Sequence, residues 1–100
     1  MTQGRGRRPD GGRSVDEPIR LGVVDDHEAV RIGIVGAAHL DARSARWPIR
    51  VTCAAETVDE VISAGAGTCQ IVALDLSLAD GSSPATNIDR LHEHGCAVII

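Results

Sequence analysis

The chain has 100 residues, a formal net charge of −4 and a single aromatic residue, Trp47. This length allows one compact domain and excludes most multi-domain enzymes. All ten cationic residues are arginine, so no mechanism in this chain can use a lysine ammonium. Residues 19–100 carry six arginines against eleven acids. Because DNA binding needs a basic face, this balance argues against direct contact with DNA.

Residues 1–18 contain four glycines among four arginines and show no hydrophobic periodicity. Such a segment buries too little apolar surface to offset its ordering entropy, so we predict a disordered leader. A basic arm that touches an acidic partner is the alternative interpretation. The start of the chain lacks the apolar stretch of a signal peptide, and no run is long enough to span a bilayer. These features predict a cytoplasmic protein without membrane contact.

The first predicted elements are a strand over 19–24 and a helix over 27–39. The strand is an apolar run that ends at two acids, which is typical of a mostly buried strand. Val30, Ile34 and Ala38 recur at a spacing of four residues. This spacing places them on one face of an amphipathic helix, which we expect to be buried.

A strand over 49–53 follows a loop that contains Trp47. Its apolar residues alternate with polar ones, which predicts one buried face and a position at a sheet edge. The next predicted helix begins with a capping box, in which Thr57 and Glu60 satisfy free amides reciprocally. Gly65 is placed to end this short helix.

Residues 70–74 are almost wholly apolar and predict a central parallel strand covered on both faces. Ser83 and Pro84 form a favourable helix start, and Gly95 a favourable stop. The inner face of this helix is expected to hold Ile88 and Leu91. The last predicted strand covers 96–100. We expect Cys53, Cys69 and Cys96, which are odd in number and form no C-x-x-C motif, to be buried reduced thiols.

The predicted order is βαβαβαβ. Right-handed crossovers then place helices on both faces of a parallel sheet, which is a doubly wound α/β fold. Ligands of such sheets bind outside the carboxyl ends of the strands. Asp25, Asp26 and Asp75 stand at those ends, and they share one small pocket if the first and third strands are neighbours. Their repulsion raises the pKa of at least one carboxyl unless a cation offsets it, and Mg²⁺ prefers such oxygen ligands.

Other polar residues have structural interpretations. Taken separately, Asp25 or Asp26 could merely cap the following helix. We expect Asp80 in a turn and His27 at the edge of the pocket. The remaining candidates, His92 and His94, are expected to interact with a helix dipole, since they lack the spacing of a zinc-binding helix motif.

Two segments resemble response-regulator receiver domains. Residues 23–31, Val-Val-Asp-Asp-His-Glu-Ala-Val-Arg, are similar to the opening of receivers of the NarL/FixJ (LuxR-type) group. Residues 72–82 are similar to the stretch around the phosphoacceptor of that family. The resemblance covers residues 19–100 and implies a flavodoxin-like, CheY-like fold of strand order 2-1-3-4-5. We therefore expect 19–100 to be an incomplete receiver domain whose fifth strand and last helices are missing.

The resemblance implies a phosphorylation-controlled switch rather than an enzyme with turnover. Asp75 would accept a phosphoryl group from the phosphohistidine of a sensor histidine kinase. Asp26 would ligate Mg²⁺ directly, Asp25 mostly through water, and Ser77 through its backbone carbonyl. A C-terminal helix-turn-helix domain, missing from this chain, would bind DNA and control transcription. A second copy of the chain is a further candidate partner.

The chain also departs from the family pattern. A Thr or Ser after the fourth strand would fall beyond Ile100, and the Lys after the fifth strand is excluded by composition. Ala79 stands where Pro is common. One alternative is therefore a phosphorylation-independent pseudo-receiver or inert fragment. Another is a phosphatase resembling the haloacid-dehalogenase family, although Ser77 stands where that motif has a second Asp. The apolar edge of the last strand also predicts poor solubility.

Overall fold

The computed structural model describes residues 17–41 and 48–100. Strands and helices alternate along these residues in the predicted order βαβαβαβ. The elements are β1 (Ile19–Val24), α1 (Glu28–Asp41), β2 (Ile49–Ala55), α2 (Val58–Ser63), β3 (Ile71–Leu74), α3 (Pro84–Glu93) and β4 (Ala97–Ile99). The predicted leader, apart from its last two residues, and the loop position Trp47 lie outside the described residues.

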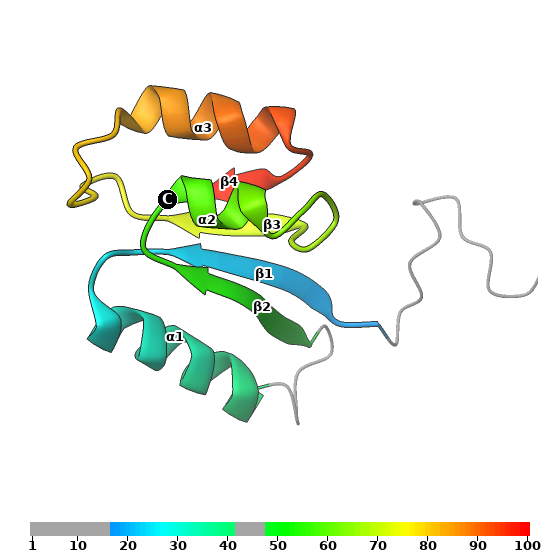
Figure 1. The fold of residues 1–100 in the computed structure, drawn as a ribbon. Coiled ribbons are helices and arrows are strands. Elements are labelled where there is room, and N and C mark those ends of the chain that lie inside the picture. Colours follow the sequence, from blue (N-terminus) through cyan, green and yellow to red (C-terminus); the bar gives the residue numbers. More distant parts are fainter. Residues whose placement is uncertain (1–16, 42–47) are drawn as a thin grey trace, which may run out of the picture.

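The four strands of the described residues form one parallel sheet in the order β2-β1-β3-β4. Helix α1 lies on one face of this sheet, and α2 and α3 lie on the other (Figure 1). The doubly wound α/β fold is therefore confirmed, with β2 at the predicted edge. Because β1 and β3 are neighbours and parallel, their carboxyl ends meet at the same edge of the sheet.

The core lies between the sheet and the pair of helices α2 and α3. Strand residues and helix residues from both layers meet there, and each is nearly inaccessible to solvent. The cluster comprises Val24, Ala55, Val58, Val61, Cys69, Val72, Leu74, Leu78, Leu91 and Cys96. Burial of Cys69 and Cys96 as free thiols is thus confirmed, whereas Cys53 is half-buried. This core anchors the strands that lead to the carboxyl edge.

The ends of α2 and α3 lie at the predicted residues, but only one half of the predicted capping box forms, because the Glu60 carboxylate accepts from the hydroxyl of Thr57 and not from its N–H. The hydroxyl of Thr57 accepts a hydrogen bond from the Glu60 N–H and donates one to the Glu60 carboxylate, both at 3.3 Å. Helix α3 has Ser83 as its N-cap, and Pro84 occupies its first turn. Gly65 and Gly95 follow α2 and α3 with φ values of 103° and 93°, a conformation that favours glycine.

Helix α1 is less buried than its sequence pattern predicts. Ile34 and Ala38 are half-buried, but Val30 is 42% exposed, so its predicted burial is wrong. The predicted cover of both faces of β3 is also wrong, since Ile71 and Ala73 are only half-buried. The reason is the position of α1, which packs mainly on β2 and less on β1.

Strand β2 contains an irregularity that the sequence pattern does not show. Leu21 pairs with Val51 and Gly22 with Cys53, so Thr52 is an extra residue in the ladder. Such a bulge interrupts the alternation predicted for 49–53. The exposed edge at β4 agrees with the expectation for the last strand, and its effect on solubility stays a prediction. No helix in the described part of the chain is long and apolar enough to cross a membrane.

Candidate functional site

Backbone hydrogen bonds place two aspartates side by side at the carboxyl edge of the sheet. The N–H of Asp75 donates to the carbonyl of Val24 at 2.9 Å, and the N–H of Asp25 donates to that of Ala55 at 3.0 Å. These bonds extend the pairing of β1 with β3 and β2 by one residue. The predicted convergence of Asp25 and Asp75 therefore follows directly from the strand order.

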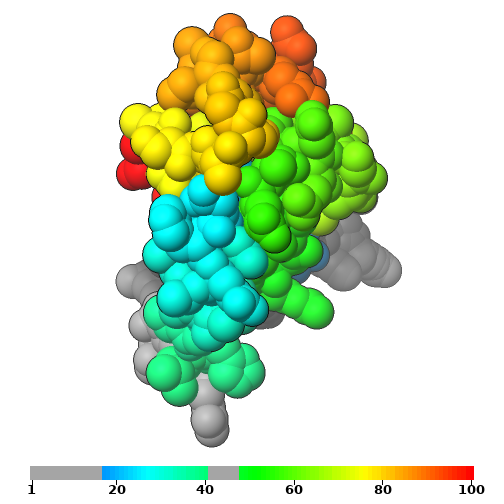
Figure 2. Space-filling model, turned by 60° about the vertical axis from the view of Figure 1, so that its left-hand side comes forward, coloured from blue at the N-terminus to red at the C-terminus, as the bar shows by residue number. Residues whose placement is uncertain are grey.

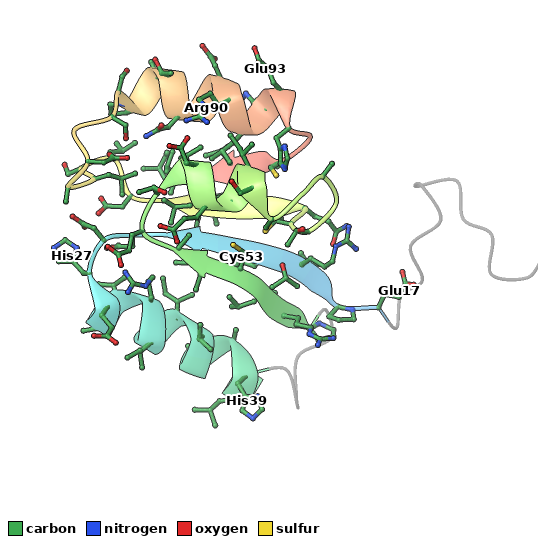
Figure 3. All side chains as sticks on the ribbon, viewed as in Figure 1. Glu17, His27, His39, Cys53, Arg90 and Glu93 are labelled. Atoms are coloured by element: carbon green, nitrogen blue, oxygen red, sulfur yellow. The ribbon has the colours of Figure 1, made fainter. Side chains whose placement is uncertain are left out.

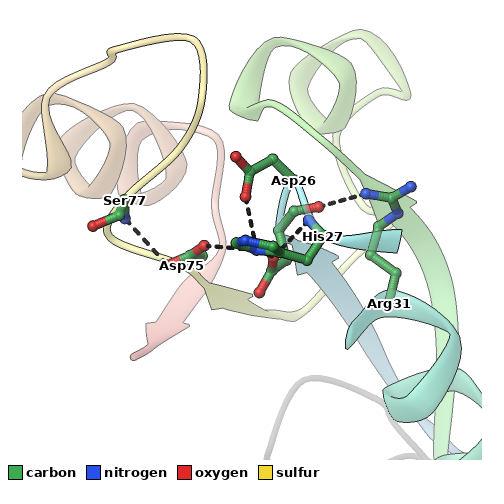
Figure 4. A network of polar contacts seen from close by, with 6 residues as sticks. Asp26, His27, Arg31, Asp75 and Ser77 are labelled. Carbon is green, nitrogen blue, oxygen red and sulfur yellow. Dashed lines mark hydrogen bonds and ion pairs between the residues drawn. The ribbon is translucent and has the colours of Figure 1, made fainter. Parts of the chain in front are cut away.

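Three carboxylates and one imidazole meet at this point (Figure 4). His27 Nδ1 lies 2.8 Å from Asp25 Oδ1, 3.0 Å from Asp26 Oδ1 and 4.0 Å from Asp75 Oδ2. One ligand atom from each of these four residues lies within 4.8 Å of all the others. The prediction that His27 only borders the pocket is thus incomplete, because its ring nitrogen faces all three acids. Its position next to Asp-Asp was the available signal.

Local structure holds His27 in this position. The backbone N–H of His27 donates to Asp25 Oδ1 at 2.9 Å, which closes a tight turn between β1 and α1. The carbonyl of His27 then accepts the N–H groups of Val30 and Arg31 at 3.1 Å. Arg31 returns to the site, since its Nη1 donates to the Asp25 carbonyl at 2.7 Å. No sequence motif indicates this role of Arg31.

The contacts with His27 also set the charge of Asp25. Burial alone would raise the pKa of this carboxyl, but hydrogen bonds from His27 and the nearby positive charges outweigh it and lower the pKa. The hydrogen bond with Asp25, and then the charges of Asp26, Asp25 and Asp75, raise the pKa of His27. The mutual repulsion expected from the sequence therefore does not dominate at Asp25, because the imidazole lies between the acids.

Asp26 has a different environment from Asp25. Its Oδ1 is buried and receives no hydrogen bond within the described residues, although His27 Nδ1 is nearby. A buried carboxylate oxygen without a donor is costly in free energy. A divalent cation would remove this cost, since carboxylate oxygens are the ligands that such ions prefer. The donor set of Asp25, Asp26 and Asp75 therefore fits the metal ion expected from the sequence.

The loop after β3 is held by its own hydrogen bonds. The N–H of Ser77 donates to Asp75 Oδ1 at 3.1 Å, which orients the carboxylate. Asp80 accepts from the N–H and hydroxyl of Ser82, so it is the predicted turn residue. The Ser82 hydroxyl accepts from Nδ2 of Asn87 at 2.9 Å. Asn87 is 2% exposed and is the buried polar anchor of this loop, a role that no sequence pattern predicted.

The site opens to solvent at one end of the sheet. Figure 2 shows this end, where the start of α1 (cyan) lies against the loop after β3 (yellow). A pocket here includes both Asp25 and Asp75, and its apolar lining comprises Val24, Ala73, Leu74, Leu76 and Ile100. The side chain of Asp75 is 24% exposed. Its carboxylate is therefore ordered by the loop and still accessible to a reagent.

The other histidines lie elsewhere. Figure 3 shows His27 at the carboxyl edge and His39 near the opposite end of α1. His92 lies in the last turn of α3, and His94 is its C-cap residue. This placement agrees with the predicted interaction with the helix dipole. The cluster of ligand atoms found in the described residues includes neither of them.

The fold of this chain is similar to part of a known response regulator. No family model and no curated protein match the sequence. A solved structure, the response regulator PhyR from Brucella abortus, matches with a TM-score of 0.59 and 25% identity. The match covers 83% of this chain and 32% of that one, so this chain spans about a third of that protein's length. The CheY-like receiver resemblance is thereby confirmed at the level of the fold, and the NarL/FixJ type stays a prediction.

Proposed function

We propose that this chain is the phosphoacceptor receiver module of a two-component response regulator, with Asp75 as the phosphoacceptor. The observation that carries the proposal is the convergence of Asp25, Asp26 and Asp75, with ligand atoms within 4.8 Å of one another. The likeness to part of a response regulator supports it. In other doubly wound sheets too, ligands bind at this edge.

The proposed step is a phosphoryl transfer. An oxygen of Asp75 attacks the phosphorus of a phosphohistidine on a sensor kinase, and a new P–O bond forms. The P–N bond breaks, and its electron pair returns to the imidazole of the kinase, which takes up a proton. Catalysis of such transfers consists mainly of positioning and charge compensation. The Ser77 N–H, 3.1 Å from Asp75 Oδ1, provides part of the positioning.

Mg²⁺ is the proposed cofactor. When bound, it neutralises the charge that gathers on the phosphoryl oxygens during transfer. Asp26, whose Oδ1 is buried without a hydrogen bond within the described residues, is the proposed direct ligand. Asp25 acts mostly through water, since His27 and Arg31 already engage its side chain and carbonyl. Asp75 and the backbone carbonyl of Ser77 complete the protein ligands of the proposal.

The partners and output belong to the same proposal. The donor is a sensor histidine kinase, and the NarL/FixJ type implies a helix-turn-helix domain outside this chain that binds DNA and controls transcription. The acidic composition of residues 19–100 supports this division, because it leaves DNA contact to another domain. A cytoplasmic location and homodimer formation are further parts of the proposal.

Two alternatives make different chemical demands. The haloacid-dehalogenase type needs a second acid two residues after the nucleophile, and Ser77 offers only its N–H and hydroxyl there. The pseudo-receiver alternative requires that Asp75 stay unphosphorylated although a phosphoryl donor and Mg²⁺ are present. The proposed nucleophile Asp75 and the proposed metal-binding acids Asp25 and Asp26 favour the receiver proposal over the pseudo-receiver, and Ser77 favours it over the phosphatase.

Phosphorylation of the full chain tests the proposal. The protein is incubated with acetyl phosphate and Mg²⁺, and its intact mass is measured. We expect one phosphoryl adduct that disappears in Asp75→Asn and in the presence of a chelator. Asp80→Asn is the matched control, because Asp80 belongs to the same loop and is engaged by Ser82; its adduct should remain.

Other outcomes would identify the alternatives. An adduct that persists in Asp75→Asn would contradict the assignment of Asp75. Continuous release of phosphate from an aryl phosphate would favour a phosphatase. The absence of any adduct, with circular dichroism showing a folded chain, would favour a pseudo-receiver.

A further inference from the structure

We infer that Cys53 and Cys69 form a reversible modification site, in which an excess of hydrogen peroxide oxidises the two thiols to a disulfide. The site lies in the core on the α2/α3 side of the sheet. Neither cysteine belongs to the group of acids at the carboxyl edge, so the site is independent of the proposed function. Both are free thiols in the structure, which therefore shows the reduced state of the pair.

Gly22 leaves the space in which the two cysteines meet. Cys53 pairs with Gly22 across β1 and β2, so the two residues lie side by side on neighbouring strands. A Cβ atom on Gly22 would lie 2.7 Å from Sγ and 3.4 Å from Cβ of Cys69. The Cys69 side chain therefore lies directly over Gly22, whose backbone is about 4.8 Å from that of Cys53.

Both thiols lie on the same side of the sheet. Paired residues of neighbouring strands point to the same face, so the side chain of Cys53 points to the face on which Cys69 covers Gly22. Cys53 packs against the buried cluster that contains Cys69. The next residue of β2 agrees, since Thr52 Oγ1 lies 3.6 Å from Cys69 Sγ. Burial and then the neighbouring Cys69 thiol raise the pKa of Cys53.

The third cysteine has a different contact. Cys96 Sγ donates a hydrogen bond to the carbonyl of Cys69 at 3.5 Å, and Cys96 is buried, whereas Cys53 is half-buried and Figure 3 shows it on β2. Cys53 is therefore the thiol that a small oxidant reaches first. Cys69 lies in the segment between α2 and β3, outside the regular strands. A small shift of this segment gives the Cβ separation of about 3.8 Å that a disulfide needs.

The oxidation has two steps. The sulfur of Cys53 attacks one oxygen of hydrogen peroxide, an S–O bond forms and the O–O bond breaks, and the departing hydroxide takes the thiol proton to leave as water. The sulfur of Cys69 then attacks the sulfenic sulfur, so that an S–S bond forms and the S–O bond breaks. The hydroxide released takes the proton of Cys69. The thiols are oxidised, and the peroxide is reduced to water.

The surroundings of the pair set both the rate and the effect of the modification. The thiolate is the reactive form of a cysteine, and the raised pKa keeps Cys53 protonated at neutral pH. The reaction therefore needs an excess of oxidant, and a dithiol reductant reverses it. The disulfide closes a loop that contains α2, Val58–Ser63, and so connects both ends of this helical segment to the sheet.

Peptide mapping of the full chain tests the pair. The protein is treated with hydrogen peroxide, unfolded in N-ethylmaleimide and digested with a protease that cleaves after glutamate, since Glu56 and Glu60 separate the two cysteines. We expect a peptide pair linked through Cys53 and Cys69, and alkylation of Cys96 alone. Dithiothreitol should restore all three thiols.

Serine variants locate the disulfide. Cys53→Ser and Cys69→Ser should each lose the linked peptides. Cys96→Ser is the matched control, because Cys96 contacts the carbonyl of Cys69 and not its thiol; it should keep them. Circular dichroism checks that each variant is folded.

Hydrogen exchange gives a second readout that needs no variant. In the unmodified chain, the amides of α2 should exchange more slowly after oxidation and regain their original rate after reduction. Unchanged exchange would overturn the inference. A disulfide between Cys69 and Cys96, a disulfide between two chains, a sulfinic acid on Cys53 without linked peptides, or three free thiols after treatment with excess peroxide would each overturn it as well.

Discussion

The two faces of the sheet are packed very differently. On the side of α2 and α3, the core residues from Val24 to Cys96 are each at most 7% exposed. On the side of α1, the helix leaves large side chains in water: Val30, Ile32, Val35 and Leu40 are 42%, 63%, 40% and 73% exposed. Burial of apolar surface is the main favourable term in folding. The α2/α3 face therefore supplies most of the stability of the described domain.

The candidate site draws on both faces. Asp25 and Asp75 follow β1 and β3, and these strands pack into the core on the α2/α3 face. Leu78, in the loop after β3, packs into the same core. Asp25 and Asp75 are therefore positioned by the well-packed α2/α3 face. His27 and Arg31, which lower the pKa of Asp25, belong by contrast to the less buried α1 face.

A pair of leucines should show the largest contrast. Leu91 on α3 is 0% exposed and Leu40 on α1 is 73% exposed. Leu91→Ala should lower the free energy of unfolding by about 3 kcal/mol, because it removes buried methyl groups and leaves a cavity. Leu40→Ala should change it by less than about 0.5 kcal/mol. Urea unfolding followed by circular dichroism measures both, and similar losses would contradict the division between the two faces.

Gly22 tests how closely the α2/α3 face is packed. A Cβ atom on this residue would lie 2.7 Å from Sγ of Cys69 and 3.3 Å from Cγ2 of Val72. Gly22→Ala should therefore lower the free energy of unfolding by about 2 kcal/mol through overpacking. Adding Cys69→Ala removes the closest atom, so the double variant should be more stable than the sum of the single losses predicts. Simple additivity in thermal unfolding would show that the loss has another cause.

Glycines on α1 should behave in the opposite way. A Cβ atom at Gly36 would meet no heavy atom of the described residues within 4 Å. Gly36→Ala should raise the free energy of unfolding by about 0.5 to 1 kcal/mol, because alanine has the higher helix propensity. Chemical denaturation compares this variant with Gly22→Ala. A loss of stability in Gly36→Ala would mean that the α1 face is packed more closely than its exposure indicates.

The smallest effect should be the pH dependence at Asp80. Hydrogen bonds from the hydroxyl and the N–H of Ser82 lower the pKa of Asp80 from its usual 3.8. A lowered carboxyl pKa contributes stability above the usual value, and this contribution is lost as the pH falls through the lower, folded pKa. The difference in unfolding free energy between the unmodified chain and Asp80→Asn should therefore shrink between about pH 6 and pH 2.

Ser82→Ala provides the control for this pH effect. It removes the hydroxyl that donates to Asp80 Oδ1 at 2.6 Å, so the same pH dependence should decrease. If the difference in unfolding free energy between the unmodified chain and Asp80→Asn does not change with pH, Ser82 does not lower the pKa of Asp80 as described.

Much of the fold could be predicted because its signals are local. Ser83 and Pro84 begin α3, as predicted. The Ser83 hydroxyl accepts a hydrogen bond from a free backbone N–H of the first turn, and Pro84 has no backbone N–H that would be left unpaired there. Once β1 and β3 are neighbours in the sheet, the acids that follow these two strands lie close together. The position of α1 relative to the sheet was not predictable from its own residues, because it depends on which strands the helix crosses.

The candidate site was only partly predictable for the same reason. The convergence of Asp25 with Asp75 follows from two strand ends and one neighbour relation. The contacts of His27 with all three acids depend on the turn angle between β1 and α1, and those of Arg31 depend on the first helical turn. The bulge at Thr52 likewise depends on pairing between β1 and β2. None of these is encoded in a short repeating pattern.

The sequence by itself determined the order of elements, the helix ends and the three carboxylates, because hydrophobic period, capping chemistry and strand-terminal acids each act within a few residues. The tertiary structure decided which face became the core, how far α1 is exposed and how an imidazole came to lie among the acids. These features depend on distances between segments far apart in the chain. Such distances are set by packing, which sums small contacts over many residues and leaves no signature at any one of them.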